Sequence, residues 1–196
     1  IRAALRHLAG LINQDQFADV MGELDDKRAV FKQLLKAQGG HQGLMIAVRR
    51  TLGLGPDETS DDILGNAAGD AAFDGAALKQ AVLALEHGAK TDKERGATIA
   101  TWLAMPPPER AHILTGDYGD AFLTKDREPR KKVTTKGTNE ADPDAEPILR
   151  VEQDRLYAVI QRLRACAMAQ ATESLLIVGE ALLTGYENLK RTRALL

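Results

Sequence analysis

The last fifty residues of the chain, 147–196, constrain the fold most, because after Pro147 they contain no further proline and only two glycines, Gly179 and Gly185. Apolar residues recur in this stretch at the three- and four-residue spacing of one helix face. They are Leu149, Leu156, Ile160, Leu163, Ala167, Leu175, Leu182, Tyr186 and Leu189. The pattern predicts one long helix, about 75 Å if straight, with any break or bend near residues 165–172. A free coiled coil is the alternative, but the alanines in the stripe and the short heptad run favour a packed helix.

Most of the remaining chain is also predicted to be helical. Alanine and leucine are abundant, runs of β-branched residues are scarce, and apolar residues recur at helical spacing. Ser60 and Asp74 are expected to cap two of the helices, and Thr91 with Glu94 has the spacing of a capping box. The sequence therefore predicts an all-α domain, mainly helical, with one long C-terminal helix.

A basic stretch near residue 130 is the one segment that does not follow the helical pattern. Two short segments, 121–124 and 131–135, flank a polar turn that contains Pro129. Such an arrangement is typical of an extended, hairpin-like loop. We expect this loop to project from the helical body.

The organisation of the chain follows from these elements. We divide it into a helical body at 1–137, which ends in the basic loop, and an acidic linker followed by the long helix at 138–196. The chain begins with Ile1 rather than Met, and its last residues continue the helical pattern without a terminating Gly, Asn or Pro. We therefore expect one accessory domain excised from a longer polypeptide; the alternative is a protein whose leader or tail has been removed.

Charge is distributed unevenly along the chain. The net charge of −2 comes from 26 basic and 28 acidic residues. Residues 1–123 carry 13 basic and 17 acidic side chains, a net of −4, and residues 124–196 carry 13 basic and 11 acidic ones, a net of +2. The total therefore conceals a basic segment inside an otherwise acidic protein.

Six cations between residues 124 and 137 are the candidate DNA-binding residues. They are Lys125, Arg127, Arg130, Lys131, Lys132 and Lys136. Lysine and arginine bind phosphate oxygens, so a phosphate backbone is the ligand that such a loop would fit. Among the aromatic residues only Tyr118 and Phe122 lie close by, which argues against a surface for stacking bases. The pattern indicates backbone contact without sequence readout; the alternative is a solvated surface without a ligand.

Several kinds of chemistry have no counterpart in the sequence. It contains no phosphate loop of the Gly-x-x-x-x-Gly-Lys-Ser/Thr type, so no ATP site is expected within it. The four histidines are scattered and none has metal-ligand spacing, so we expect no metal site and no catalytic residue. Cys166, the single cysteine, excludes an internal disulfide, and neither a secretory signal nor a long uncharged apolar run is present. We therefore expect a cytosolic location and no membrane contact.

Two segments resemble the AddA family of bacterial helicase-nuclease subunits, which belongs to the UvrD/RecB-like DNA helicases. The first is FLTKDREPRKKVTTK at 122–136, followed by the acidic linker, and the second is YENLKRTRALL at 186–196. In the family a Tyr-x-x-x-Lys helix end leads into an acidic ATPase motif. Tyr186 and Lys190 match that helix end, and the motif would be expected to begin where the chain stops, at Leu196. The chain departs from the family at Arg127, where glycine is more usual, which puts the tightness of the turn in question.

The resemblance implies that this chain is the helical 1B subdomain, an insertion in the first motor domain. The expected function is that of an accessory DNA-engaging domain of an ATP-dependent 3′–5′ DNA helicase and nuclease subunit that acts in double-strand break repair and recombination. The expected partners are DNA at a duplex/single-strand junction, an AddB-like subunit and the remaining motor domains. ATP and Mg²⁺ would bind in those motor domains, and the implied location is the bacterial cytoplasm. The alternative is a helical protein-interaction module that docks a partner subunit without direct DNA contact.

Overall fold

The structure is a computed structural model that describes residues 1–194, apart from the side chains of Glu187, Leu189 and Ala194. The Leu189 side chain, where the predicted apolar stripe ends, and Leu196, where the predicted long helix ends, lie outside the described part of the chain. All the secondary-structure elements in the described residues are helices. The only β-type pairing among these residues is one isolated antiparallel bridge between Leu123 and Pro129. The predicted all-α fold class is confirmed.

The chain divides into two compact units, each of which is described by itself. Unit 1 comprises Ile1–Glu58 with the described part of the chain from Ala165 onward, and unit 2 comprises Thr59–Arg164. These units separate at other positions than our sequence-based boundary between 137 and 138, because the long C-terminal helix contributes residues to both.

The helices of unit 1 come first along the chain. They are α1 (Arg2–Ala9), α2 (Gln14–Asp26), α3 (Arg28–Ala37) and α4 (His41–Thr51). Those of unit 2 are α5 (Ser60–Ala68), the 3₁₀ helix η1 (Asp70–Ala72), α6 (Gly75–Leu85), α7 (Lys90–Ala104), α8 (Pro107–Ile113), α9 (Asp117–Phe122) and α10 (Lys136–Ala141). The last helix, α11 (Ala145–Ala194), serves both units.

The predicted long C-terminal helix is confirmed as α11, which is a single helix of 50 residues. The helix is continuous through 165–172, the interval in which the sequence would place any break or bend. No proline or glycine lies in that interval to interrupt the hydrogen-bond ladder. The boundary between the two units nevertheless falls next to it, at 164/165.

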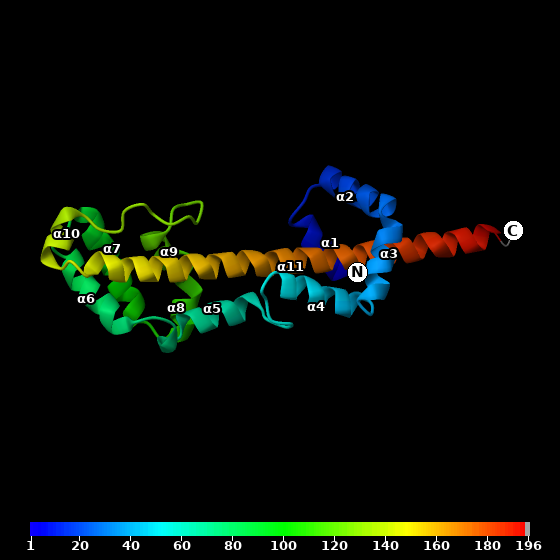
Figure 1. Ribbon diagram of the computed structural model, residues 1–196. Coiled ribbons are helices and arrows are strands. Elements are labelled where there is room, and N and C mark those ends of the chain that lie inside the picture. Colours follow the sequence, from blue (N-terminus) through cyan, green and yellow to red (C-terminus); the bar gives the residue numbers. More distant parts are fainter. Residues whose placement is uncertain (195–196) are drawn as a thin grey trace. The chain divides into compact units, whose positions relative to one another are not determined.

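Unit 2 is built around aromatic side chains that pack against the first part of α11. Trp102 of α7 is fully buried and stacks on Tyr118 of α9, with ring centroids 3.9 Å apart. Leu149 and Leu156 of α11 complete the same core. Figure 1 shows α6, α7, α9 and α10 gathered beside the yellow end of α11. This core holds together α7, α9 and α11, the helices that the basic loop contacts.

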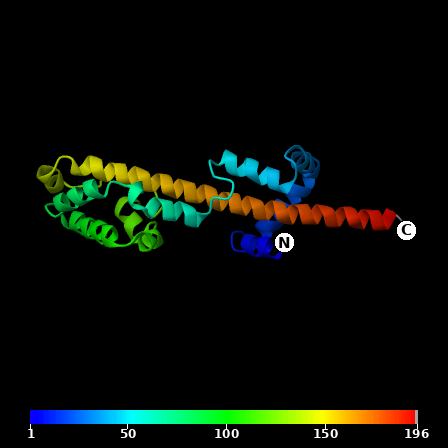
Figure 2. The same cartoon turned by 90° about the horizontal axis from the view of Figure 1, so that it is seen from below.

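Unit 1 has a smaller core. Ala4 and Leu8 of α1 pack against Val178 of α11, with Phe17 and Met21 of α2 partly buried beside them. Both views place the blue to cyan helices α1–α4 beside the orange to red part of α11 (Figures 1 and 2). Helix α2 contains no fully buried residue, so it contributes only partial burial to this unit.

The predicted helix caps have different outcomes. Asp74 caps α6 as expected, accepting hydrogen bonds from the backbone of Ala76 and Ala77. The cap of α5 is Thr59 rather than Ser60, and it forms a capping box with Asp62. The predicted box at Thr91 is wrong, because α7 begins at Lys90 without a side-chain cap.

Helix α11 meets a test of length and composition for a membrane-spanning helix, with an 18-residue window whose mean hydropathy is 1.3. This finding is weak evidence, because the core helix of a soluble protein passes the same test. In the structure 33% of that window is buried, with Val178 in the core of unit 1. This helix by itself does not assign a location to the protein.

Candidate nucleic-acid interface

The basic loop, residues 123–135 between α9 and α10, contains a short hairpin. Leu123 and Pro129 form the antiparallel bridge, the Thr124 N–H donates to the Glu128 carbonyl at 2.8 Å, and the Arg130 N–H donates to the Phe122 carbonyl at 3.0 Å. The hairpin-like character is as predicted, but its arms are not. Residues 121 and 122 end α9, and no hairpin pairing extends from 131 to 135 in the described backbone.

The turn of the hairpin holds Arg127 in the left-handed backbone region, with φ of 62°. It is the only non-glycine residue with positive φ in the part of the chain that the structure describes. Its N–H closes the turn by donating to the Thr124 carbonyl at 2.9 Å. A β-carbon makes this conformation unfavourable, so glycine would suit the position better than arginine.

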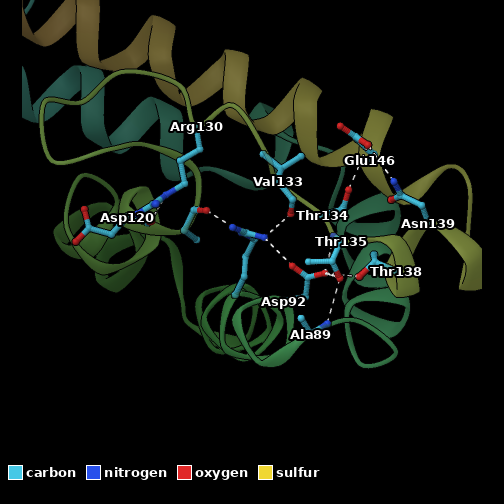
Figure 3. Close-up of polar contacts among 12 residues, drawn as sticks. Ala89, Asp92, Asp120, Arg130, Val133, Thr134, Thr135, Thr138, Asn139 and Glu146 are labelled. Carbon is cyan, nitrogen blue, oxygen red and sulfur yellow. Dashed lines mark hydrogen bonds and ion pairs between the residues drawn. The ribbon is translucent and has the colours of Figure 1, made fainter.

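One side of the loop is anchored on α7 by a buried carboxylate (Figure 3). Asp92 is only 1% exposed. Its Oδ2 accepts hydrogen bonds from the Thr135 N–H at 2.8 Å and from the hydroxyls of Thr135 and Thr138, both at 2.6 Å. Its Oδ1 accepts one from Arg95 Nη1 at 3.2 Å. Burial opposes ionisation of Asp92, but these hydrogen bonds and the charge of Arg95 outweigh it and lower the pKa of the carboxyl.

Arg95 extends the same anchor toward the hairpin. Its Nε donates to the carbonyl of Ala121 at 2.9 Å, and its Nη1 also donates to the carbonyl of Val133. Burial outweighs the charge of Asp92, so the pKa of this guanidinium is lowered. Asp92 and Arg95 together therefore fix the loop where it leaves α9 and where it enters α10.

The other side of the loop is anchored on α11. Arg150 donates to the carbonyls of Arg130 and Lys131 at 2.9 and 2.6 Å. The buried Gln153 donates to the carbonyls of Phe122 and Arg130 at 2.7 and 3.1 Å. These hydrogen bonds hold the backbone of the loop and leave the lysine side chains unrestrained.

Further contacts fix the two ends of this attachment. Glu146 accepts hydrogen bonds from Thr134 and Asn139, and the hydrogen bond from Arg150 is the main cause of its lowered pKa. At the tip, Arg164 donates to the carbonyl of Asp126 at 2.9 Å and forms an ion pair with Glu128 at 3.6 Å. Sequence reasoning missed these supporting residues. Their only signal is the spacing of polar residues along α11.

The six predicted DNA-binding residues fall into two groups. Lys125, Lys131 and Lys132 are exposed and form no ion pair within the described structure. The other three have partners within the chain, although the side chain of Lys136 is 89% exposed. Arg127 forms an ion pair with Asp120 at 2.7 Å, Arg130 Nε donates to the Asp120 carbonyl at 3.1 Å, and Lys136, the first residue of α10, pairs with Glu140 at 3.2 Å.

The neighbouring aromatic residues are not available to bases. Tyr118 and Phe122 are both fully buried. The Tyr118 hydroxyl donates to Glu152 Oε1 at 2.7 Å, and burial, followed by the charge of Glu152, raises the pKa of the phenol well above its usual range. Neither residue can therefore stack on a base, whereas Tyr157 of α11, which interacts with Glu128 of the loop, is partly exposed.

Among the residues described, no group of three or more His, Cys, Asp or Glu side chains could hold a metal ion. The chain matches no protein-family model, no curated protein and no solved structure in the comparisons made.

Proposed function

We propose that the chain is an accessory, 1B-type DNA-engaging domain of an ATP-dependent 3′–5′ DNA helicase and nuclease subunit, and that the basic loop holds the phosphates of DNA. The observation that carries the proposal is the group of three exposed lysines, Lys125, Lys131 and Lys132, on a backbone anchored from both α7 and α11. The resemblance to the AddA family supplies the parent motor, its ATP and Mg²⁺, and its AddB-like partner. No residue of this chain is assigned to ATP hydrolysis or nuclease chemistry.

The anchored backbone favours binding for an entropic reason. A mobile loop must lose conformational freedom when it binds a ligand, and that loss weakens the complex. Here the hydrogen bond that Asp92 accepts and those that Arg95, Arg150 and Gln153 donate already order the backbone. Only the lysine side chains remain to be ordered. Because each ammonium is a point charge, the contact would follow the DNA backbone without reading its sequence.

The number of free cations sets the salt dependence. Three phosphate contacts give a slope of log affinity against log salt of about −2.7 for duplex DNA, whereas all six predicted cations would give about −5. Binding of the chain to a labelled DNA duplex with a single-stranded tail, measured by fluorescence anisotropy over a series of salt concentrations, distinguishes these values.

A charge-matched pair of variants tests the site. Lys131→Ala with Lys132→Ala should weaken binding and reduce the slope to about −0.9, because one free lysine remains on the loop. The control removes the same charge from exposed lysines elsewhere in unit 2, Lys79 and Lys93. Equal losses in both double variants, or no loss in the first, would contradict the proposal.

The alternative, a protein-interaction module, also has one supporting observation. An open, largely apolar groove of about 740 Å³ lies between α6 and the start of α11, and its lining includes Phe73, Ile148 and the 72% exposed Val151. An AddB-like subunit docked there would stay bound at high salt and without DNA. A chain that lacks salt-dependent DNA binding but retains such a partner favours this alternative.

A further inference from the structure

Two of the predicted phosphate contacts converge on a single residue of α9. Asp120 accepts a hydrogen bond from Arg127 Nη1 through its Oδ1 at 2.7 Å and one from Arg130 Nε through its backbone carbonyl at 3.1 Å. A carboxylate oxygen and a carbonyl oxygen thus occupy the guanidinium groups in the manner of phosphate oxygens. The same loop leaves its three lysines without ion pairs within the described residues.

The geometry of the turn directs Arg127 to this position. The residue is held at φ of 62° by the hydrogen bond from its N–H to Thr124. Its guanidinium lies against the backbone of α9, since a β-carbon added at the buried Gly119 would be 3.6 Å from Nη1. The side chain is 32% exposed, and that of Asp120 is 58% exposed. The ion pair is therefore accessible to solvent at its carboxylate end, where an approaching phosphate would compete.

We infer that Asp120 limits the strength of DNA binding by withholding Arg127 from the phosphate surface. This inference rests on the proposed function. The carboxylate acts as an internal substitute for one phosphate, so that Arg127 does not count among the cations that the loop presents to DNA. Such a limit suits a domain that must release DNA repeatedly, because each additional phosphate contact slows dissociation and increases the salt dependence.

Asp120→Ala tests the inference, with Asp117→Ala as the control. Both residues are exposed acids in the first turn of α9, and only Asp120 has an arginine partner among the described residues. Each substitution removes one negative charge from the same helix. Asp120→Ala should make the log–log slope steeper by about 0.9, the contribution of one new contact, and tighten binding to the tailed duplex about tenfold at low salt. Asp117→Ala should tighten binding only slightly and leave the slope unchanged.

A double variant identifies the residue that is released. Arg127→Ala alone should leave the slope unchanged, because Asp120 already pairs with that guanidinium, and should lower affinity only slightly, through the carboxylate left unpaired at Asp120. In the Asp120→Ala background the same change should remove the entire gain. A shallower slope in Arg127→Ala alone, or a gain that survives in the double variant, would overturn the inference. Circular dichroism and thermal unfolding of each variant show whether the fold is intact, and Arg127→Gln serves as a second variant if alanine disturbs the turn.

The outcomes separate this inference from the proposed function. If Lys131→Ala with Lys132→Ala weakens binding but Asp120→Ala leaves the slope unchanged, only the role of Asp120 is refuted. If the unaltered chain shows no salt-dependent DNA binding, the proposed function is refuted and the role of Asp120 with it.

Discussion

Replacing Asp92 by asparagine should destabilise unit 2 substantially, because this side chain meets only hydrogen-bond donors. Three donors from Thr135 and Thr138 reach Oδ2, and Arg95 reaches Oδ1. An asparagine has one acceptor oxygen, so its amide group must face donors at the other position. In the more stable orientation of the asparagine amide, the oxygen keeps the three hydrogen bonds that Oδ2 accepts in the native protein. The charged hydrogen bond from Arg95 is then lost, which lowers the free energy of unfolding by about 2 kcal/mol. The site is buried, with side-chain exposures of 1% and 12%, so solvent screens the pair little.

Trp102 provides an assay that reports on unit 2 alone. It is the only tryptophan of the chain, is fully buried and lies in that unit. Urea unfolding followed by its fluorescence should show a lower midpoint for Asp92→Asn, with an unchanged dependence on urea. In a thermal scan the same loss corresponds to about 8–16 °C for a unit of this size. The control is Asp154→Asn, an exposed position of α11 with no partner among the described residues, which should change stability by less than about 0.5 kcal/mol. An Asp92→Asn variant as stable as this control would refute the reasoning.

Three further outcomes are expected in the same unfolding assay. The pKa values of Asp92 and Glu146 are lowered in the folded protein, so their ionised forms stabilise it fully above the ordinary pKa values of 3.8 and 4.5. This stabilisation is lost as the pH falls through the pKa values of the folded protein, so the free energy of unfolding should decrease below about pH 4, and less so in Asp92→Asn. Parallel plots of the free energy of unfolding against pH for the two proteins would contradict this assignment. Arg127→Gly should be more stable than Arg127→Ala by about 1 kcal/mol, since both lose the ion pair to Asp120 and only glycine tolerates positive φ without strain; equal stabilities would show that the turn is relaxed. Gly65→Ala should stabilise unit 2 by about 0.5–1 kcal/mol, because a β-carbon at this exposed position of α5 meets nothing within 4 Å, and a lower midpoint would indicate a contact that the structure lacks.

Local patterns in the sequence were sufficient for part of the fold. The uninterrupted apolar stripe of the last fifty residues predicts α11, and Asp74 lies where a side-chain oxygen can cap the helix that follows it. These features depend on residues three or four positions apart, and helix geometry alone brings such residues together. The basic composition of the loop is equally local, so its six cations could be identified without a structure.

The remaining features required tertiary contacts. The capping box at Thr91 does not form, since α7 begins one residue before it, at Lys90. The Ala89 N–H at this helix end donates instead to the hydroxyl of Thr135, 46 residues further along the chain. Local spacing contains no information about such a partner.

The state of each cation is also decided by the tertiary structure. The sequence alone determined that 124–137 is basic and that no phosphate loop accompanies it. The packing of the loop against α9 and α11 decided that Arg127 and Arg130 are engaged at Asp120, while Lys125, Lys131 and Lys132 remain exposed. The physical reason is that charge is a property of composition, whereas availability depends on which acceptors the fold brings within hydrogen-bond distance.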